Sequence, residues 1–161
     1  NFVMAIGVAF YCPYDGIISN EKILSVVQRL YNKGIRRVYL AASTGMENPS
    51  NINYVFNKIR DKFLDLDYGF HVHDRIGMAA TNMFSALDAG ASSIEGSICG
   101  IGGGIAMPHG TGDYGNLPTE DIVTMLNRSK IETQLNEKVV HETAEKIAHL
   151  LEINSNSRTN I

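Results

Sequence analysis

The stretch YGFHVHD, residues 68–74, decides the fold of this chain. Its apolar start and the helix-like segment at residues 78–89 predict a β-strand followed by an α-helix. Two histidines, His71 and His73, stand one residue apart where the strand ends. Because side chains at i and i+2 of a strand share a face, both imidazoles can point at one divalent cation. Taken alone the pair is a weak signal, since histidines at strand ends are often hydrogen-bonded surface groups.

The same alternation of strand and helix extends to both sides of this stretch. We expect four strands, at residues 2–10, 37–42, 68–72 and 93–98. We expect helices from Ser19 or Asn20 to residue 32, around residues 52–59, and at residues 78–89, 119–128 and 136–152. Strands that alternate with helices of this length imply parallel pairing through right-handed crossovers.

Two α/β architectures fit this pattern, a doubly wound sheet and a TIM (β/α)8-barrel. In all four units, polar residues and glycines crowd the loop after the strand, where barrels build their active sites, although doubly wound sheets also bind ligands at that edge. Four βα units are half of the eight that a closed barrel requires. Two sheet edges would be left open, so we expect a missing N-terminal half-barrel or a partner subunit, such as a second copy, to cover them.

The length, composition and charge of the chain limit the kinds of protein it can be. With 161 residues and 44% hydrophobic content, one domain is expected, over residues 1–153, with residues 154–161 as a frayed polar tail. The chain begins at Asn1 directly before a strand, which suggests a fragment or a processed product. A net charge of -3 without a basic stripe argues against a nucleic-acid partner.

The chain also lacks the signals of a membrane or secreted protein. No apolar run reaches the roughly 18 to 20 residues of a membrane span, so no membrane partner is expected. Cys12 and Cys99 lie far apart and do not suggest a disulfide framework. A cytoplasmic location is favoured, with an organelle matrix as the alternative.

Four sequence blocks carry a family resemblance: HVHDRIGMAATN at residues 71–82, ALDAGA at 86–91, GIGG at 100–103 and GNLPTED at 115–121. Their order and spacing resemble the C-terminal half of 3-hydroxy-3-methylglutaryl-CoA lyase and its relatives, the DRE-TIM metallolyases. The loop CPYDG at residues 12–16 is similar to that family as well. The resemblance covers about residues 2–152 and implies that this chain forms the C-terminal four βα units of a barrel, plus a C-terminal helix.

The resemblance implies a ligand set for a divalent cation, usually Mg²⁺ or Mn²⁺. In that family the two histidines bind the cation together with the asparagine of the GN motif and an aspartate from the first barrel strand. By position, the ligands here are His71, His73 and Asn116, and the aspartate has no counterpart. The implied substrate is a small acyl-CoA or a 2-oxo acid.

Three functions follow from the resemblance. The first is a carbon–carbon lyase that cleaves a 3-hydroxy-3-carboxyalkyl acyl-CoA by a retro-Claisen reaction. The second is a Claisen-condensing synthase or an aldolase of the same superfamily, and the third is a non-catalytic scaffold. Two departures motivate the alternatives: Gly104 stands where the lyases carry a proton-transferring cysteine, and Ala42 stands where they carry an aspartate.

Several side chains are candidates for catalysis beside the ligand His71. His109 could act as general acid at neutral pH, and Cys99 is the other candidate for that role, although it lies five residues too early to be the missing cysteine. Glu120 either reaches the active site or serves as a first-turn acid that complements its helix dipole.

Backbone and supporting roles are also expected near the histidines. The glycines Gly102, Gly103 and Gly104 could let backbone amides approach a phosphate or carboxylate, or could form only a turn. Asn82 is expected to support the histidine loop. Glu95 is expected to line the barrel interior, paired with Arg75 or with a residue of the missing half.

Overall fold

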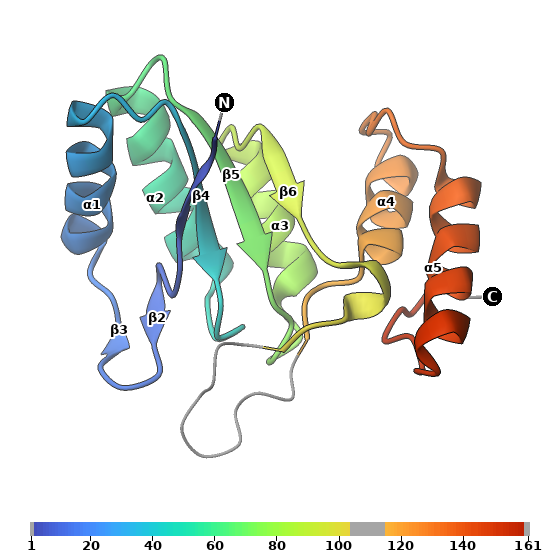
Figure 1. Cartoon of the computed structure of the whole chain (residues 1–161). Coiled ribbons are helices and arrows are strands. Elements are labelled where there is room, and N and C mark those ends of the chain that lie inside the picture. Colours follow the sequence, from blue (N-terminus) through green and yellow to red (C-terminus); the bar gives the residue numbers. More distant parts are fainter. Residues whose placement is uncertain (1, 104–114, 160–161) are drawn as a thin grey trace.

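The computed structural model describes residues 2–103 and 115–159, and its centre is a four-stranded sheet (Figure 1). The strands, in sheet order, are β1 (Met4–Ile6), β4 (Arg37–Ala42), β5 (Asp67–Val72) and β6 (Ser93–Glu95). Every neighbouring pair is parallel, as the alternating pattern predicted. Parallel pairing places the carboxyl ends of all four strands at one edge of the sheet.

Three helices connect these strands: α1 (Asn20–Asn32), α2 (Pro49–Lys62) and α3 (Ala79–Asp88). In Figure 1, α2 and α3 lie behind the sheet and α1 stands beside it at the left. Helix α1 begins where the sequence indicated, because the Ser19 side chain accepts a hydrogen bond from the Lys22 backbone N–H. Helix α2 begins with Asn48 as its cap and Pro49 in its first turn. Both starts therefore follow local rules of helix capping.

Two of the predicted strands are shorter than expected. The first ends at Ile6, because Val8 takes a positive φ of 44° and its N–H bonds to the Ser43 hydroxyl. The last ends at Glu95, because the chain then pairs with the segment around Leu117, whose carbonyl accepts from the Ser97 N–H at 3.2 Å. Long-range contacts thus end both strands early. Between β1 and α1, the chain adds a small hairpin of β2 (Tyr11–Cys12) and β3 (Gly16–Ile17).

The hydrophobic core lies between the sheet and helices α1 to α3. Phe10, Phe56 and Phe70 meet there, with ring centroids 5.7 to 6.4 Å apart. On β4, Val38 and Leu40 face this core and are almost completely buried. Aromatic contacts of this kind, together with burial of the apolar strand faces, hold the sheet against its helices.

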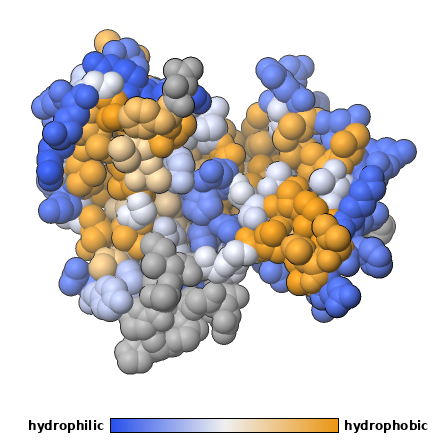
Figure 2. Space-filling model, viewed as in Figure 1, coloured by the Kyte–Doolittle hydropathy of each residue, from blue (hydrophilic) through white to orange (hydrophobic). Residues whose placement is uncertain are grey.

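The opposite face of the sheet is only partly covered. Tyr39 and His71 are half-buried there, and Glu95 is exposed. Figure 2, seen from this side, shows a hydrophobic area over β1 and β4 and hydrophilic residues toward β5 and β6. Among the described residues, β1 and β6 each have one neighbouring strand.

A second layer lies beside β6 and consists of the helices α4 (Thr119–Arg128) and α5 (Glu137–Leu151) with the short 3₁₀ turn η1 (Ile98–Gly100). The polar tail is not frayed over residues 155–159, contrary to the expectation from sequence. Residues 155–159 are hydrogen-bonded to Cys99, Glu120 and Asp121, because the backbone and hydroxyl donors of this segment find carboxylate and carbonyl acceptors. No helix in the described part of the chain is long and apolar enough to cross a membrane.

Candidate metal centre

His71 and His73 lie at the carboxyl end of β5 and face the same cavity. The Nε2 atoms of the two rings are 3.1 Å apart, and the rings are nearly perpendicular at 70°. His71 is half-buried and His73 is 6% exposed. The i and i+2 spacing thus brings both imidazoles together, as the sequence predicted.

Asn116 is held directly opposite His73. The two residues form an antiparallel bridge, with the Leu117 N–H donating to Val72 O at 3.1 Å and the Asp74 N–H donating to Gly115 O at 3.4 Å. These backbone contacts set the segment around Asn116 alongside the end of β5. The structure therefore brings together the three predicted ligands, although Asn116 lies far from the histidines in sequence.

The side chain of Asn116 has a defined orientation. Its Nδ2 donates to the carbonyl oxygens of Ile101 at 2.9 Å and Gly102 at 3.3 Å. Because only the amide nitrogen can donate to carbonyls, the Oδ1 atom is directed elsewhere. Oδ1 is buried and has no hydrogen-bond partner among the described residues. Such an oxygen is costly to bury unless something binds it.

The cavity in front of these side chains has a volume of about 260 Å³. Its lining residues are Ala5, Gly7, Tyr39, Ala41, Ser43, His71, His73, Gly103 and Asn116. Two imidazole nitrogens and an unsatisfied amide oxygen form a mixed donor set that suits a divalent cation. No group of three or more His, Cys, Asp or Glu side chains that could hold a cation occurs among residues 2–103 and 115–159. The described residues thus offer part of a coordination sphere.

Glu95 is a residue of the site whose role the sequence did not reveal. It pairs in register with His71 across β5 and β6, and its Oε2 lies 3.0 Å from His71 Nδ1. The contact is an ion-pair distance and does not form a hydrogen bond, because His71 Nδ1 has no hydrogen-bond partner among the described residues. The parallel register sets His71 beside Glu95. The expected pairing of Glu95 with Arg75 or with a residue of the missing half stays a prediction.

Cys99 and Glu120 lie away from the histidine cavity. The Cys99 N–H lies 3.1 Å from each carboxylate oxygen of Glu120, and its thiol donates to Ala144 O at 3.2 Å. Burial raises the pKa of the Cys99 thiol, so the thiolate is disfavoured. The two side chains join η1, α4 and α5, and the structure does not bring them to His71 and His73.

The glycine loop is described only in part. Ile101 and Gly102 turn their carbonyl oxygens toward Asn116, and Gly103 lines the cavity. The predicted anion contact through amides of Gly102 and Gly103 stays a prediction. Gly104 and His109 lie outside the described residues, so the predicted general acid stays a prediction as well.

Asn82 supports a different loop from the one expected. Its Nδ2 donates to the Glu47 carbonyl at 3.0 Å, which ties α3 to the loop after β4 rather than to the histidine loop. Glu47 is itself buried, and its Oε1 accepts a hydrogen bond from Thr44 Oγ1. Burial raises the pKa of the Glu47 carboxyl. The sequence contained no signal for this contact.

Comparison with known proteins gives one consistent family. The model of the HMGL-like family matches residues 3–147. Cytoplasmic 3-hydroxy-3-methylglutaryl-CoA lyase of Mus musculus is 29% identical over 150 residues, which are 93% of this chain and 43% of that protein. Mitochondrial hydroxymethylglutaryl-CoA lyase of Bos taurus is 32% identical over 147 residues, which are 91% of this chain and 44% of that protein. This chain thus spans less than half the length of these relatives, which occupy two different compartments.

A solved structure gives the same result for the fold. An HMG-CoA lyase from Acinetobacter baumannii, in complex with coenzyme A and 3-methylmalate, superposes with a TM-score of 0.88 at 26% identity. The match covers 98% of this chain and 50% of that lyase. That neighbour is a TIM barrel, so the four parallel βα units here correspond to half of a barrel.

Proposed function

The chain belongs to the HMGL-like family, and on that premise we propose that it forms the cation-binding half of a divalent-metal-dependent carbon–carbon lyase. The substrate is a 3-hydroxy-3-carboxyalkyl acyl-CoA, cleaved in the retro-Claisen direction. The bound complex of the Acinetobacter baumannii lyase supports a coenzyme A thioester as the substrate class. The shared family and the lyase activity of the relatives support the reaction type.

One observation carries the proposal more than any other: His71, His73 and the unsatisfied Oδ1 of Asn116 converge on one cavity. Mg²⁺ or Mn²⁺ fits a donor set of two nitrogens and an amide oxygen, with the remaining positions open to water and substrate. When bound, the cation supplies an electrophile that holds the carboxylate and hydroxyl oxygens of the substrate.

The residues of this chain orient that donor set. The Glu95 carboxylate lies 3.0 Å from His71 Nδ1 and so favours the ring proton on that nitrogen, which leaves the Nε2 lone pair available for a cation. The carbonyls of Ile101 and Gly102 hold the amide nitrogen of Asn116, so its oxygen faces the cavity. A preorganised set of this kind saves the entropy of ordering each ligand when the cation binds.

In the proposed cleavage, a base removes the substrate hydroxyl proton, the carbon–carbon bond breaks, and an acid protonates the enolate of the departing acyl-CoA. Cys99 and Glu120 face η1, α4 and α5, which argues against them as the acid. His109 remains the candidate that the sequence suggests.

We also propose that four further βα units complete the barrel, from additional chain or from a partner subunit. The half-exposed face that carries Tyr39 and His71 supports this, because the interior of a barrel is normally filled by side chains from all eight strands. The two outer strands β1 and β6 would gain their second neighbours in the same way.

The test is metal analysis and turnover of the protein at its full natural length. We expect wild-type protein to bind Mn²⁺ and to release acetyl-CoA from 3-hydroxy-3-methylglutaryl-CoA. The variants His71→Ala and His73→Ala should lose both, and the matched control His149→Ala, an exposed histidine on α5, should lose neither.

Other outcomes would contradict the proposal in different ways. Unchanged metal content in both variants would refute the cation site. Condensation of acetyl-CoA with a 2-oxo acid, without cleavage, would favour the synthase. Metal binding without turnover of any hydroxyacyl-CoA would favour a scaffold.

A further inference from the structure

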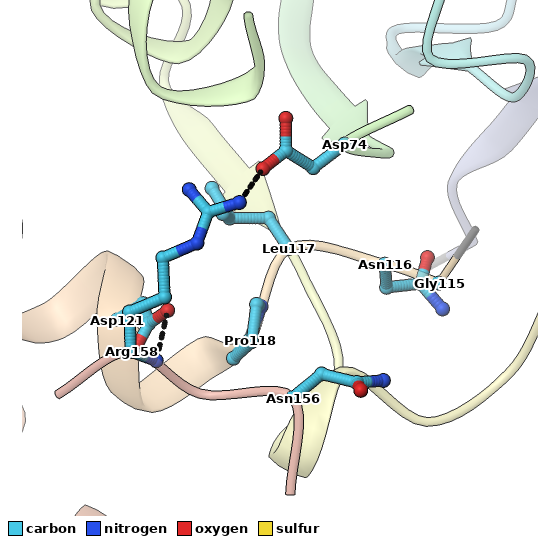
Figure 3. Close-up of a pocket in the computed structure, with 8 residues that line it drawn as sticks. All are labelled: Asp74, Gly115, Asn116, Leu117, Pro118, Asp121, Asn156 and Arg158. Carbon is cyan, nitrogen blue, oxygen red and sulfur yellow. Dashed lines mark hydrogen bonds and ion pairs between the residues drawn. The ribbon is translucent and has the colours of Figure 1, made fainter. Parts of the chain in front are cut away.

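The last described residues of the chain form a strap, residues 155–159, across the loops that carry the candidate ligands (Figure 3). Asn156 donates its backbone N–H to Cys99 O at 3.1 Å, in the turn that follows β6. Ser155 Oγ donates to Glu120 Oε1 at 3.2 Å, at the start of α4. The strap therefore contacts two of the segments that surround the glycine loop.

Asp121 anchors the middle of the strap. This buried carboxylate accepts hydrogen bonds from Ser157 Oγ at 2.5 Å, from the Arg158 N–H at 3.0 Å and from Thr159 Oγ1 at 2.7 Å. Several donors on one carboxylate fix the backbone of the strap at the first turn of α4. As a result, the Arg158 side chain leaves this anchor in a defined direction.

Arg158 reaches the loop after β5, as Figure 3 shows. Its Nη2 lies 2.9 Å from Asp74 Oδ2, and the Asp74 side chain is only 12% exposed. The other oxygen, Asp74 Oδ1, accepts a hydrogen bond from the Ala79 N–H at the start of α3. Asp74 is thus held between a helix start and the strap.

Asp74 is the residue that follows His73, and it takes part in the backbone bridge that sets His73 opposite Asn116. Asp121 and Asp74 also line one cavity of about 230 Å³, together with Asn116 and Arg158. Arg158 therefore links the helix after the Asn116 segment, through its backbone N–H on Asp121, to the loop that begins with His73, through its guanidinium on Asp74.

We propose that Arg158 is a positioning residue for this ligand pair: it holds the His73 loop against the Asn116 segment through Asp74 and Asp121. The expected effect of Arg158 on cation binding rests on the proposed function. The expected effect of Arg158 on the position of the His73 loop rests only on the contacts described above. Because Arg158 is 75% exposed, the link is partly screened by water and its effect is modest.

The experiment uses two readouts on Arg158→Gln in the protein at its full natural length. The first is amide hydrogen exchange of residues 73–79 without added metal, and the second is Mn²⁺ affinity by calorimetry. We expect exchange in this loop to speed up by about three- to tenfold and Mn²⁺ to bind more weakly by a similar factor. Arg158→Lys should keep loop exchange and Mn²⁺ affinity close to those of wild type, because lysine keeps the positive charge that faces Asp74.

Arg60→Gln is the matched control, since Arg60 on α2 also forms an exposed ion pair, with Asp61 at 3.2 Å. It should change neither readout. Ser157→Ala, which removes one donor to Asp121, should give an intermediate effect without touching the guanidinium. Agreement among these four variants would support the proposal.

Three results would overturn the inference. In the first, amide exchange in residues 73–79 is as fast in Arg158→Gln as in Arg60→Gln. In the second, exchange becomes faster across the whole sheet and Arg158→Lys does not restore it. In the third, exchange in the loop becomes faster but Mn²⁺ affinity does not change. Failure of the proposed function gives a different result, because wild-type protein would then bind no Mn²⁺. The difference in amide exchange between Arg158→Gln and Arg60→Gln would still show whether the strap holds the loop.

Discussion

The Nε2 atoms of His71 and His73 lie 3.1 Å apart, and Glu95 contacts the other ring nitrogen of His71 at 3.0 Å. When the ring proton of His71 is on Nδ1, the Nε2 atom of His71 carries a lone pair that faces the cavity. In the metal-free protein, this Nε2 atom then accepts a hydrogen bond from Nε2–H of His73. A carboxylate behind an imidazole in this way is the arrangement found behind many metal-binding histidines. The relationship between these residues leads to the first prediction.

Replacement of Glu95 by glutamine should weaken divalent-cation binding by about tenfold. Glutamine keeps the shape of the side chain but removes the negative charge that favours the proton on His71 Nδ1. Titration of Mn²⁺ by calorimetry measures the effect. Glu142→Gln, at an exposed position on α5, is the control, and equal affinity in both variants would refute a role for Glu95.

Replacement of Asn116 by aspartate should destabilise the metal-free protein by about 1–3 kcal/mol, although aspartate is a good cation ligand. The new carboxylate oxygen would face the carbonyl oxygens of Ile101 and Gly102, which now accept from the amide nitrogen. Urea unfolding without metal measures the loss. Asn154→Asp, at an exposed position, should have little effect. If both variants unfold alike, the amide orientation inferred for Asn116 is wrong.

Replacement of Gly115 by alanine should displace the Asn116 segment. A Cβ at Gly115 would lie 2.3 Å from the Gly100 carbonyl oxygen, so one backbone segment must move, at a cost of about 1–3 kcal/mol. Gly7→Ala is the matched control, because nothing lies within 4 Å of a Cβ there. The melting temperature should fall for Gly115→Ala and not for Gly7→Ala, and Mn²⁺ affinity should fall in Gly115→Ala. A neutral Gly115→Ala would contradict the close packing of these loops.

Burial of Glu47 predicts a pH dependence of stability. Its pKa is raised in the folded protein, so stability is highest below the ordinary carboxyl pKa and declines as pH rises through the folded-state pKa. Glu47→Gln should remove this decline and should be at least as stable as wild type at neutral pH, since an amide has no charge to bury. Urea unfolding at several pH values between about 4.5 and 8 tests this.

The control for Glu47 is Glu145→Gln, on the exposed side of α5, which should leave the pH profile of wild type unchanged. An identical pH slope in wild type and Glu47→Gln would show that Glu47 does not keep its proton in the folded state.

The two cysteines should differ in reactivity. Cys99 is buried, donates to Ala144 O and has a raised thiol pKa, whereas Cys12 is only half-buried on the hairpin. We expect iodoacetamide to label Cys12 much faster than Cys99 in native protein, and to label both in urea. Mass spectrometry of the two peptides gives the rates. Rapid native labelling of Cys99 would restore it as a candidate for proton transfer.

Much of the fold could be predicted from local patterns. Strand β4 and helix α4 begin and end at the predicted residues, because alternating burial and 3.6-residue periodicity are properties of short stretches of sequence. The meeting of His71, His73 and Asn116 followed from the family resemblance and from the rule that parallel strands end at one sheet edge.

The contacts around the site could not be predicted in the same way. Glu95 contacts His71 because the two residues are paired in register on β6 and β5. The Cys99 backbone N–H donates to the Glu120 carboxylate and so joins η1 to α4. The strap was expected to be frayed because its residues are polar, and polarity alone does not reveal a buried acceptor such as Asp121.

The sequence by itself determined the βα order, the parallel sheet and the identity of the three candidate ligands, because each depends on residue periodicity or on the spacing of the motifs that resemble the family. Only the tertiary structure decided which way Asn116 turns its oxygen, which carboxylate supports His71 and where Arg158 binds. These depend on donors and acceptors from distant segments, and such partners become neighbours only when the whole chain has folded.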